Sequence, residues 1–204
     1  MRLTLAACAV LAGASLAMDF TGPSAWSTVS TSAVEAWNDA SRKAVSPDFK
    51  AWPGVVADLR KREVRLLAEA VGHRVGVTTE FLLVGPRSDR AYEAVAVTVA
   101  LPGDIVRAVE SVGLKRGGGV GSRPFRFWPC GERMTASFRR LGGAGSEERP
   151  LQALVKDQEA SAPLIGEGGL VFSGGRWEGD VCMADTNMPS SVVSLYNAAG
   201  TIFD

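Results

Sequence analysis

Residues 62–71, REVRLLAEAV, decide the fold class of this chain. Their apolar side chains recur with a period of two, at Val64, Leu66, Ala68 and Ala70. This period is typical of a strand with one buried face. Two further segments, 78–84 and 91–100, are rich in β-branched and aromatic residues, and residues 85–89 between them have turn chemistry. We therefore expect 78–84 and 91–100 to pair as a hairpin.

Helical signals stand on either side of these strands. Residues 102–113 have apolar residues at helical spacing, with Asp104 as the expected cap and Gly113 as the stop. A second, shorter helix is expected to begin near Ser32, which forms a capping-box pattern with Glu35. The prediction is an α+β fold in a single domain, with a mostly antiparallel β-sheet, one main helix and a short N-terminal helix.

The first 17 residues have the pattern of a secretory signal peptide. Arg2 precedes an apolar run over 3–14, and the small residues of 15–17 suit a cleavage site. The run is shorter than the ~20 residues that a membrane-spanning helix needs. We expect cleavage after this segment and export to the periplasm or the extracellular space. Lipid anchoring at Cys8 and an uncleaved anchor are the alternatives.

The chain after the leader is expected to have two parts. We expect a Ser/Thr/Ala-rich segment with a short helix over 18–50 and an α+β domain over 51–204.

The charge balance limits the partners of the chain. The whole chain has 22 Lys and Arg against 22 Asp and Glu. This neutral balance argues against nucleic-acid binding, whose affinity comes largely from neutralised phosphates. No later stretch is apolar enough to predict a membrane span after cleavage.

Two cysteines lie beyond the leader, Cys130 and Cys182. They are expected to form a structural disulfide, because exported proteins fold in an oxidising compartment and two cysteines allow one connectivity. Two free thiols are the alternative. Trp128, just before Cys130, is expected to lie in the core.

Several catalytic and metal-binding constellations are missing. The one histidine, His73, excludes a histidine-rich zinc site, and two cysteines are too few for an all-thiolate zinc site or the common iron–sulfur clusters. The sequence therefore predicts no metal site and no cofactor.

Carboxylates are the remaining candidates for chemistry. Glu80, Glu93, Asp180 and Asp185 lie on or beside expected strands, and a pair of them would suit general acid–base work. Asp185 and Asn187 are also the candidates for ligand binding, although a structural turn is the favoured interpretation of their segment.

The order of these segments resembles the YdjY-type domain of exported bacterial proteins. The blocks that carry the resemblance are 58–64, 79–84, 91–94, 102–113, 170–175 and 185–191. The activity of that family is uncharacterised, so the resemblance implies no reaction and no catalytic residue. Related helices often carry a histidine in the first turn, whereas here residues 104–107 are Asp-Ile-Val-Arg.

Together these features favour a non-enzymatic binding or structural module of the periplasm or cell surface. Its expected partner is an unknown protein or cell-envelope ligand. The alternative is a carboxylate-dependent hydrolase acting on cell-wall or polysaccharide substrates. That alternative requires Glu80 or Glu93 to lie about 5–10 Å from Asp180 or Asp185 in a cleft, as paired glycosidase carboxyls do.

Overall fold

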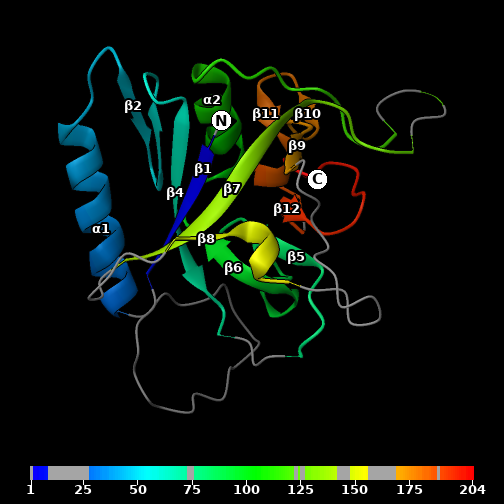
Figure 1. Ribbon diagram of the computed structural model, residues 1–204, viewed down its shortest axis with the longest axis horizontal. Coiled ribbons are helices and arrows are strands. Elements are labelled where there is room, and N and C mark those ends of the chain that lie inside the picture. The colour runs from blue at the N-terminus through cyan, green and yellow to red at the C-terminus, as the bar shows by residue number, and fades with distance from the viewer. Residues whose placement is uncertain are drawn as a thin grey trace.

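The computed structural model describes residues 2–8, 28–72, 76–121, 124, 127–141, 148–155, 169–187 and 189–204. In this part of the chain two α-helices accompany a mostly antiparallel sheet (Figure 1), which confirms the predicted α+β class. The helices are α1 (Thr28–Lys43) and α2 (Pro102–Ser111), with short 3-10 helices η1 (Ala91–Glu93), η2 (Leu151–Ala153) and η3 (Met183–Asp185). The strands are β1 (Arg2–Cys8), β2 (Phe49–Trp52), β3 (Val55–Asp58), β4 (Glu63–Ala70), β5 (Phe81–Val84), β6 (Ala94–Thr98), β7 (Glu132–Leu141), β8 (Glu148–Pro150), β9 (Leu170–Phe172), β10 (Trp177–Glu178), β11 (Val181–Cys182) and β12 (Ser191–Ser194).

Ten of these strands form one sheet. Its main path runs β12-β5-β6-β4-β1-β7-β8, while β3 joins β2 to β4 and β9 pairs with β7. The parallel pairs are β1 with β4, β1 with β7, and β5 with β6. Strands β10 and β11 form a separate antiparallel hairpin.

The C-terminal residues close the sheet into a ring. Phe203 makes a parallel bridge to Val193 of β12 and an antiparallel bridge to Phe172 of β9. Asp204 and Val171 exchange two backbone hydrogen bonds of 2.7 and 3.1 Å. Because β9 pairs with β7 and β12 pairs with β5, the ring passes through β5, β6, β4, β1, β7, β9, the C-terminal residues and β12.

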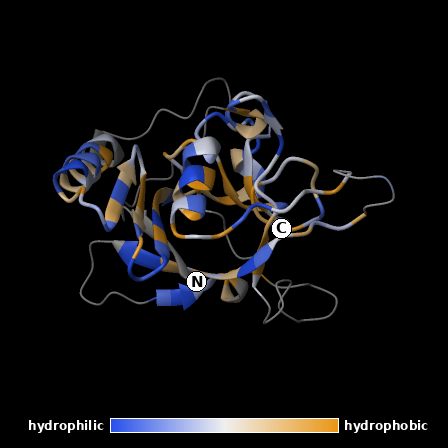
Figure 2. Cartoon of the chain, turned by 90° about the horizontal axis from the view of Figure 1, so that it is seen from above, coloured by the Kyte–Doolittle hydropathy of each residue, from blue (hydrophilic) through white to orange (hydrophobic). Residues whose placement is uncertain are grey.

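Helix α2 supplies one side of the hydrophobic core. Its buried side chains share a cluster with residues of β4, β5, β9, β12 and the C-terminus; those of α2 are Ile105, Val106, Ala108 and Val109. Figure 2 shows hydrophilic and hydrophobic residues together on this helix, as expected for an element with one buried side. Helix α1 contacts β2 and β4 instead, and Asn38 accepts a 2.9 Å hydrogen bond from the Gly54 N–H. It begins at Thr28, four residues before the expected cap at Ser32.

The strand that the period of two predicts at 62–71 is confirmed as β4. Val64, Leu66 and Ala68 are buried in the core, whereas Ala70 at the end of the strand is exposed, so the expected buried face stops one position early. Leu67 on the opposite face is also buried, with 3% of its surface exposed. The strand is therefore covered at this position on both faces, which the alternation alone does not indicate.

The first strand lies within the predicted signal peptide. Residues 2–8 form β1 between β4 and β7, with Leu3 in register with Val64 and with Ala136. Residues 9–17, where cleavage is expected, lie outside the described residues. The leader remains a prediction, and its first part forms a strand here.

The predicted hairpin of 78–84 with 91–100 is wrong. Strands β5 and β6 are parallel neighbours, with Phe81 in register with Ala94. Residues 85–93 therefore run back along β5 before β6 begins. Residues Gly85, Arg87 and Ser88 donate hydrogen bonds to the carbonyls of Ser190, Asp185 and Pro189 instead of forming a tight hairpin turn.

Candidate functional site

The first polar cluster surrounds the start of α2. Leu101 is the N-cap and has no side-chain hydrogen bond, and Pro102 occupies the first turn. The Gly103 N–H donates to Asp185 Oδ1 at 2.8 Å. The helix is therefore capped by a carboxylate from η3, far along the chain, and the predicted cap at Asp104 is wrong. Asp104 instead pairs with Arg107 at 2.8 Å.

Close packing fixes this cap. A Cβ atom on Gly103 would lie 2.5 Å from Asp185 Oδ2 and 3.1 Å from Cys182 Cβ. Contacts this short require the neighbours to move, so position 103 demands glycine. Helix-start amides and the helix dipole both favour a negative charge here.

The Asp185 carboxyl is half-buried, and its environment sets its proton affinity. Burial raises the pKa of Asp185 above its ordinary value, and the neighbouring Asp104 adds to this rise. The hydrogen bond from Gly103 and the nearby Arg107 and Arg87 oppose the rise without cancelling it. The group thus combines a raised pKa with a structural hydrogen bond.

Trp177 of β10 joins the edge of this cluster. The Arg116 guanidinium lies 4.4 Å from the Trp177 ring centroid and that of Arg107 lies 5.6 Å away. Arg116 is held by Glu110 through two contacts of 2.7 and 2.8 Å. Asp180 takes part through its backbone, whose carbonyl accepts from Arg107 at 3.4 Å. The ring is therefore flanked by cations and held against the core.

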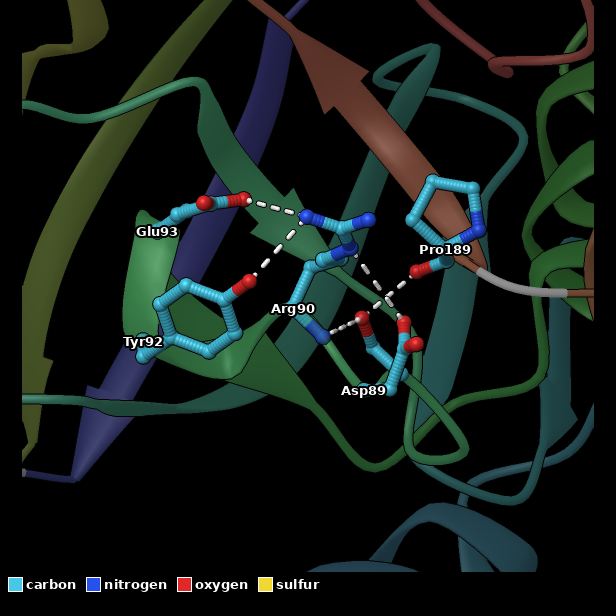
Figure 3. Close-up of polar contacts among 6 residues, drawn as sticks. Asp89, Arg90, Tyr92, Glu93 and Pro189 are labelled. Atoms are coloured by element: carbon cyan, nitrogen blue, oxygen red, sulfur yellow. Dashed lines mark hydrogen bonds and ion pairs between the residues drawn. The ribbon is translucent and has the colours of Figure 1, made fainter. Parts of the chain in front are cut away.

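The second group, the tyrosine–arginine cluster, consists of Glu80, Arg90, Tyr92, Glu93 and Tyr196. Arg90 Nη1 donates to the Tyr92 hydroxyl at 3.0 Å and contacts Glu93 Oε2 at 3.3 Å (Figure 3). The Glu80 N–H donates to the Glu93 carbonyl at 2.9 Å, so β5 and η1 bring these residues together.

Tyr196 completes the tyrosine–arginine cluster. Its ring packs edge-on against Phe81 with centroids 5.7 Å apart. Burial raises the pKa of the Tyr196 hydroxyl, Glu80 and Glu93 raise it further, and Arg90 opposes them. Tyr196 is nevertheless 48% exposed and Tyr92 is 42% exposed.

The segment after Tyr196 contacts residue 127 through its backbone, and two exposed aromatic residues follow there. Asn197, the residue after Tyr196, donates from Nδ2 to the Phe127 carbonyl at 3.4 Å. Phe127 is 67% exposed and Trp128 is 60% exposed. The expectation that Trp128 lies in the core is therefore wrong.

A pair of interlocked loops connects the two clusters. Arg87 donates to the Asp185 carbonyl at 3.0 Å, and Ser88 Oγ donates to the Pro189 carbonyl at 2.5 Å. Figure 3 shows Pro189 beside Arg90. The Gly85 N–H donates to the Ser190 carbonyl at 2.7 Å. These hydrogen bonds therefore link the segments that carry the two clusters.

The predicted candidate residues fall into two sets. Glu80 and Glu93 meet in the tyrosine–arginine cluster, whereas Asp185 and the Asp180 backbone lie at the start of α2. Asn187 lies in the connecting turn, where its carbonyl accepts from the Ser190 N–H at 3.0 Å. The Ser190–Asn187 hydrogen bond is a turn contact, whereas Met188, within the segment 185–189 that we interpret as a structural turn, lies outside the described residues.

The sequence did not single out the arginines and tyrosines of these clusters. Tyr196 packs on Phe81 and Arg107 contacts Trp177 and the Asp180 backbone, neighbours that are distant in the sequence. One local signal was available: Arg90 lies two residues before Tyr92 and three before Glu93.

The predicted disulfide is absent from the structure, in which Cys130 and Cys182 are both free thiols. Cys182 is buried against the first turn of α2, whereas the Cys130 backbone pairs with Gly118. A disulfide needs Cβ atoms about 3.5–4.5 Å apart, and sequence spacing cannot supply that distance. Burial also raises the pKa of the Cys182 thiol, which keeps it protonated and unreactive at neutral pH.

Neither a metal cluster nor a spanning helix occurs in the described part of the chain. No group of three or more His, Cys, Asp or Glu side chains there could hold a metal ion. None of the described helices is long and apolar enough to cross a bilayer. His73 lies outside the described residues.

Comparison with known proteins adds no relative: no family model, no curated protein and no solved structure matches this chain.

Proposed function

We propose that this protein is a non-enzymatic exported binding module of the YdjY type, and that its ligand engages the tyrosine–arginine cluster. The observation that carries this proposal is the partial exposure of Tyr92 and Tyr196 around the ion-paired Arg90. Tyrosine and arginine are the side chains that dominate binding energies at protein surfaces.

The surroundings of the cluster also suit binding. The loop that carries Arg90 is fixed by hydrogen bonds from Gly85 and Ser88 to the facing segment 189–190. A surface that is already ordered loses little conformational freedom when a ligand binds. The ligand class proposed is a component of the bacterial cell envelope or a protein held there.

The contacts of the carboxylates give the hydrolase alternative less support. Asp185 serves as the cap of α2, and Glu93 is paired with Arg90. A general acid–base pair needs two carboxyls that face one substrate with separated pKa values. Here one set supports a helix and the other supports an exposed ion pair.

The test is co-sedimentation of the purified protein with the cell-envelope fraction of its host. Tyr92→Ala and Tyr196→Ala should each weaken binding by about tenfold, the range of a binding hot spot. Val45→Ala is the matched control, because Val45 is 56% exposed on the segment after α1. Equal binding by all variants would contradict the proposal.

A turnover screen on cell-wall and polysaccharide substrates completes this test. We expect no turnover by the wild-type protein. If the protein shows turnover, and Glu80→Gln, Glu93→Gln or Asp185→Asn abolishes it, the hydrolase function would be supported and the non-enzymatic binding function contradicted.

A further inference from the structure

Strand β1 lies in the gap between β4 and β7 of the ring. Residues 2–7 pair in parallel with residues 63–68 of β4, and residues 2–8 pair in parallel with residues 135–141 of β7. A single strand of seven residues therefore connects the two halves of the ring. Both of its edges are hydrogen-bonded to neighbours.

The register defines what the gap accepts. Leu3, Leu5 and Ala7 are in register with Val64, Leu66 and Ala68, all three of which face the core. Because in-register neighbours point to the same side of a sheet, alternate positions of the inserted strand belong to the core face. Its first position, Arg2, is in register with Glu63.

Loss of the leader would leave this gap vacant. Strand β4 would keep β3 and β6 on its other edge, and β7 would keep β8 and β9. The facing N–H and C=O groups of both strands would then lack partners, which is costly for buried backbone. Unpaired strand edges of this kind are templates for an added strand.

We propose that the gap between β4 and β7 is a binding slot for an extended peptide segment of a partner protein. The segment runs parallel to β4, begins with a basic residue and carries small or apolar residues at alternate positions. Main-chain hydrogen bonds on two edges supply affinity, and the core-facing positions supply selectivity. This inference rests on the proposed export, because Arg2–Cys8 must leave before the slot opens. It concerns a site separate from the tyrosine–arginine cluster.

The experiment uses protein purified from the exported fraction of its host, with its N-terminus determined by intact mass. Amide hydrogen exchange is measured with and without a peptide that has the sequence of residues 2–8 and Cys8→Ser. The control peptide adds Thr4→Pro, because proline removes a backbone donor and is excluded from the interior of a sheet.

The expected result is a protein without its leader in which the amides of 63–68 and 135–141 that point into the gap exchange rapidly, whereas those bonded to the strands on the other edges stay protected. The matching peptide should slow that exchange by about tenfold or more, and the proline peptide should not. Slow exchange without any peptide would show that β4 and β7 close on each other, and would overturn the slot. Rapid exchange that the peptide leaves unchanged would also overturn it.

Determining which residue the purified protein begins with distinguishes failure of the slot proposal from failure of the export proposal on which it rests. An exported protein that still begins with residues 2–8 would overturn the slot and leave export standing. A protein confined to the cytoplasm with residues 2–8 intact would overturn both, while the tyrosine–arginine cluster would remain testable by co-sedimentation.

Discussion

The carboxylates at the start of α2 differ from those of the tyrosine–arginine cluster in the groups that hold them. Asp185 is half-buried and accepts a hydrogen bond from the backbone of Gly103, so its neighbours cannot move without disturbing the core. Glu93 contacts a flexible arginine side chain that is 45% exposed. A carboxylate therefore supports the fold at one position and forms a solvent-open ion pair at the other.

The largest expected effect comes from filling the space beside the buried carboxylate. Gly103→Ala would place a Cβ 2.5 Å from Asp185 Oδ2 and displace the cap. We expect the free energy of unfolding to fall by about 2–3 kcal/mol, as for overpacked sites. Urea unfolding followed by circular dichroism measures this fall.

Gly119→Ala is the matched control for this substitution. The nearest atom to a Cβ on Gly119 is the Gly200 backbone nitrogen at 3.6 Å, an ordinary contact. A loss of stability as large in Gly119→Ala as in Gly103→Ala would mean that the cap is not the cause.

The next effect isolates the cap itself. Asp185→Ala removes the acceptor for the Gly103 N–H, and we expect a loss of about 1–2 kcal/mol in the free energy of unfolding. Asp185→Asn keeps an oxygen acceptor and should lose less. Equal losses in the two variants would contradict the hydrogen-bond account.

The pH dependence of the stability of Asp185→Asn tests whether ionisation of the Asp185 carboxyl lowers the stability of the fold. Because folding raises the pKa of Asp185, the stability that this group contributes is present at low pH and is lost as pH rises through its folded pKa. The asparagine variant has no such loss. Its stability relative to the wild type should therefore increase with pH, which unfolding measured across a pH series can check.

Asp204 extends the comparison to a carboxylate at the seam of the ring. Burial raises its pKa to about 6 from the ordinary 3.8, against a weaker opposing hydrogen bond from the Ala198 N–H. Its contribution to stability should be complete below about pH 4 and lost as pH rises through about 6. Asp204→Asn should remove a dependence on the order of 1 kcal/mol, allowing for its partial exposure. Thermal unfolding of both proteins at about pH 4 and pH 7 tests this.

The smallest effect on stability is expected in the tyrosine–arginine cluster. Arg90→Ala breaks contacts to Tyr92 and Glu93 that are open to solvent. Exposed ion pairs contribute little to stability, so the change in unfolding free energy should be the smallest of the series. A loss as large as that of Asp185→Ala would show that this cluster is structural as well.

Local patterns predicted the elements and missed several of their partners. The alternation of Val64, Leu66 and Ala68 identified β4, and Gly113 ends the α2 segment with a φ of +93° as expected. The β5–β6 pairing could not be predicted, because the turn-forming residues 85–89 suit a hairpin and a doubling-back loop equally well. The α2 cap was missed since Asp185 lies far from Gly103 in the sequence.

The candidate site was predicted only in part for the same reason. Residue type identified Glu80, Glu93 and Asp185, but not which of them share a cluster. Solvent exposure is the second property that the sequence does not predict. Trp128 is apolar and precedes Pro129 and Cys130, yet most of its side chain faces solvent. Both properties depend on contacts between distant segments, which sequence spacing does not encode.

Co-sedimentation of Asp185→Asn and Tyr92→Ala with the host cell envelope tests the difference between the two clusters most directly. We predict that Asp185→Asn binds as the wild type does and that Tyr92→Ala binds about tenfold more weakly. Loss of binding in Asp185→Asn, with Tyr92→Ala unaffected, would contradict the account.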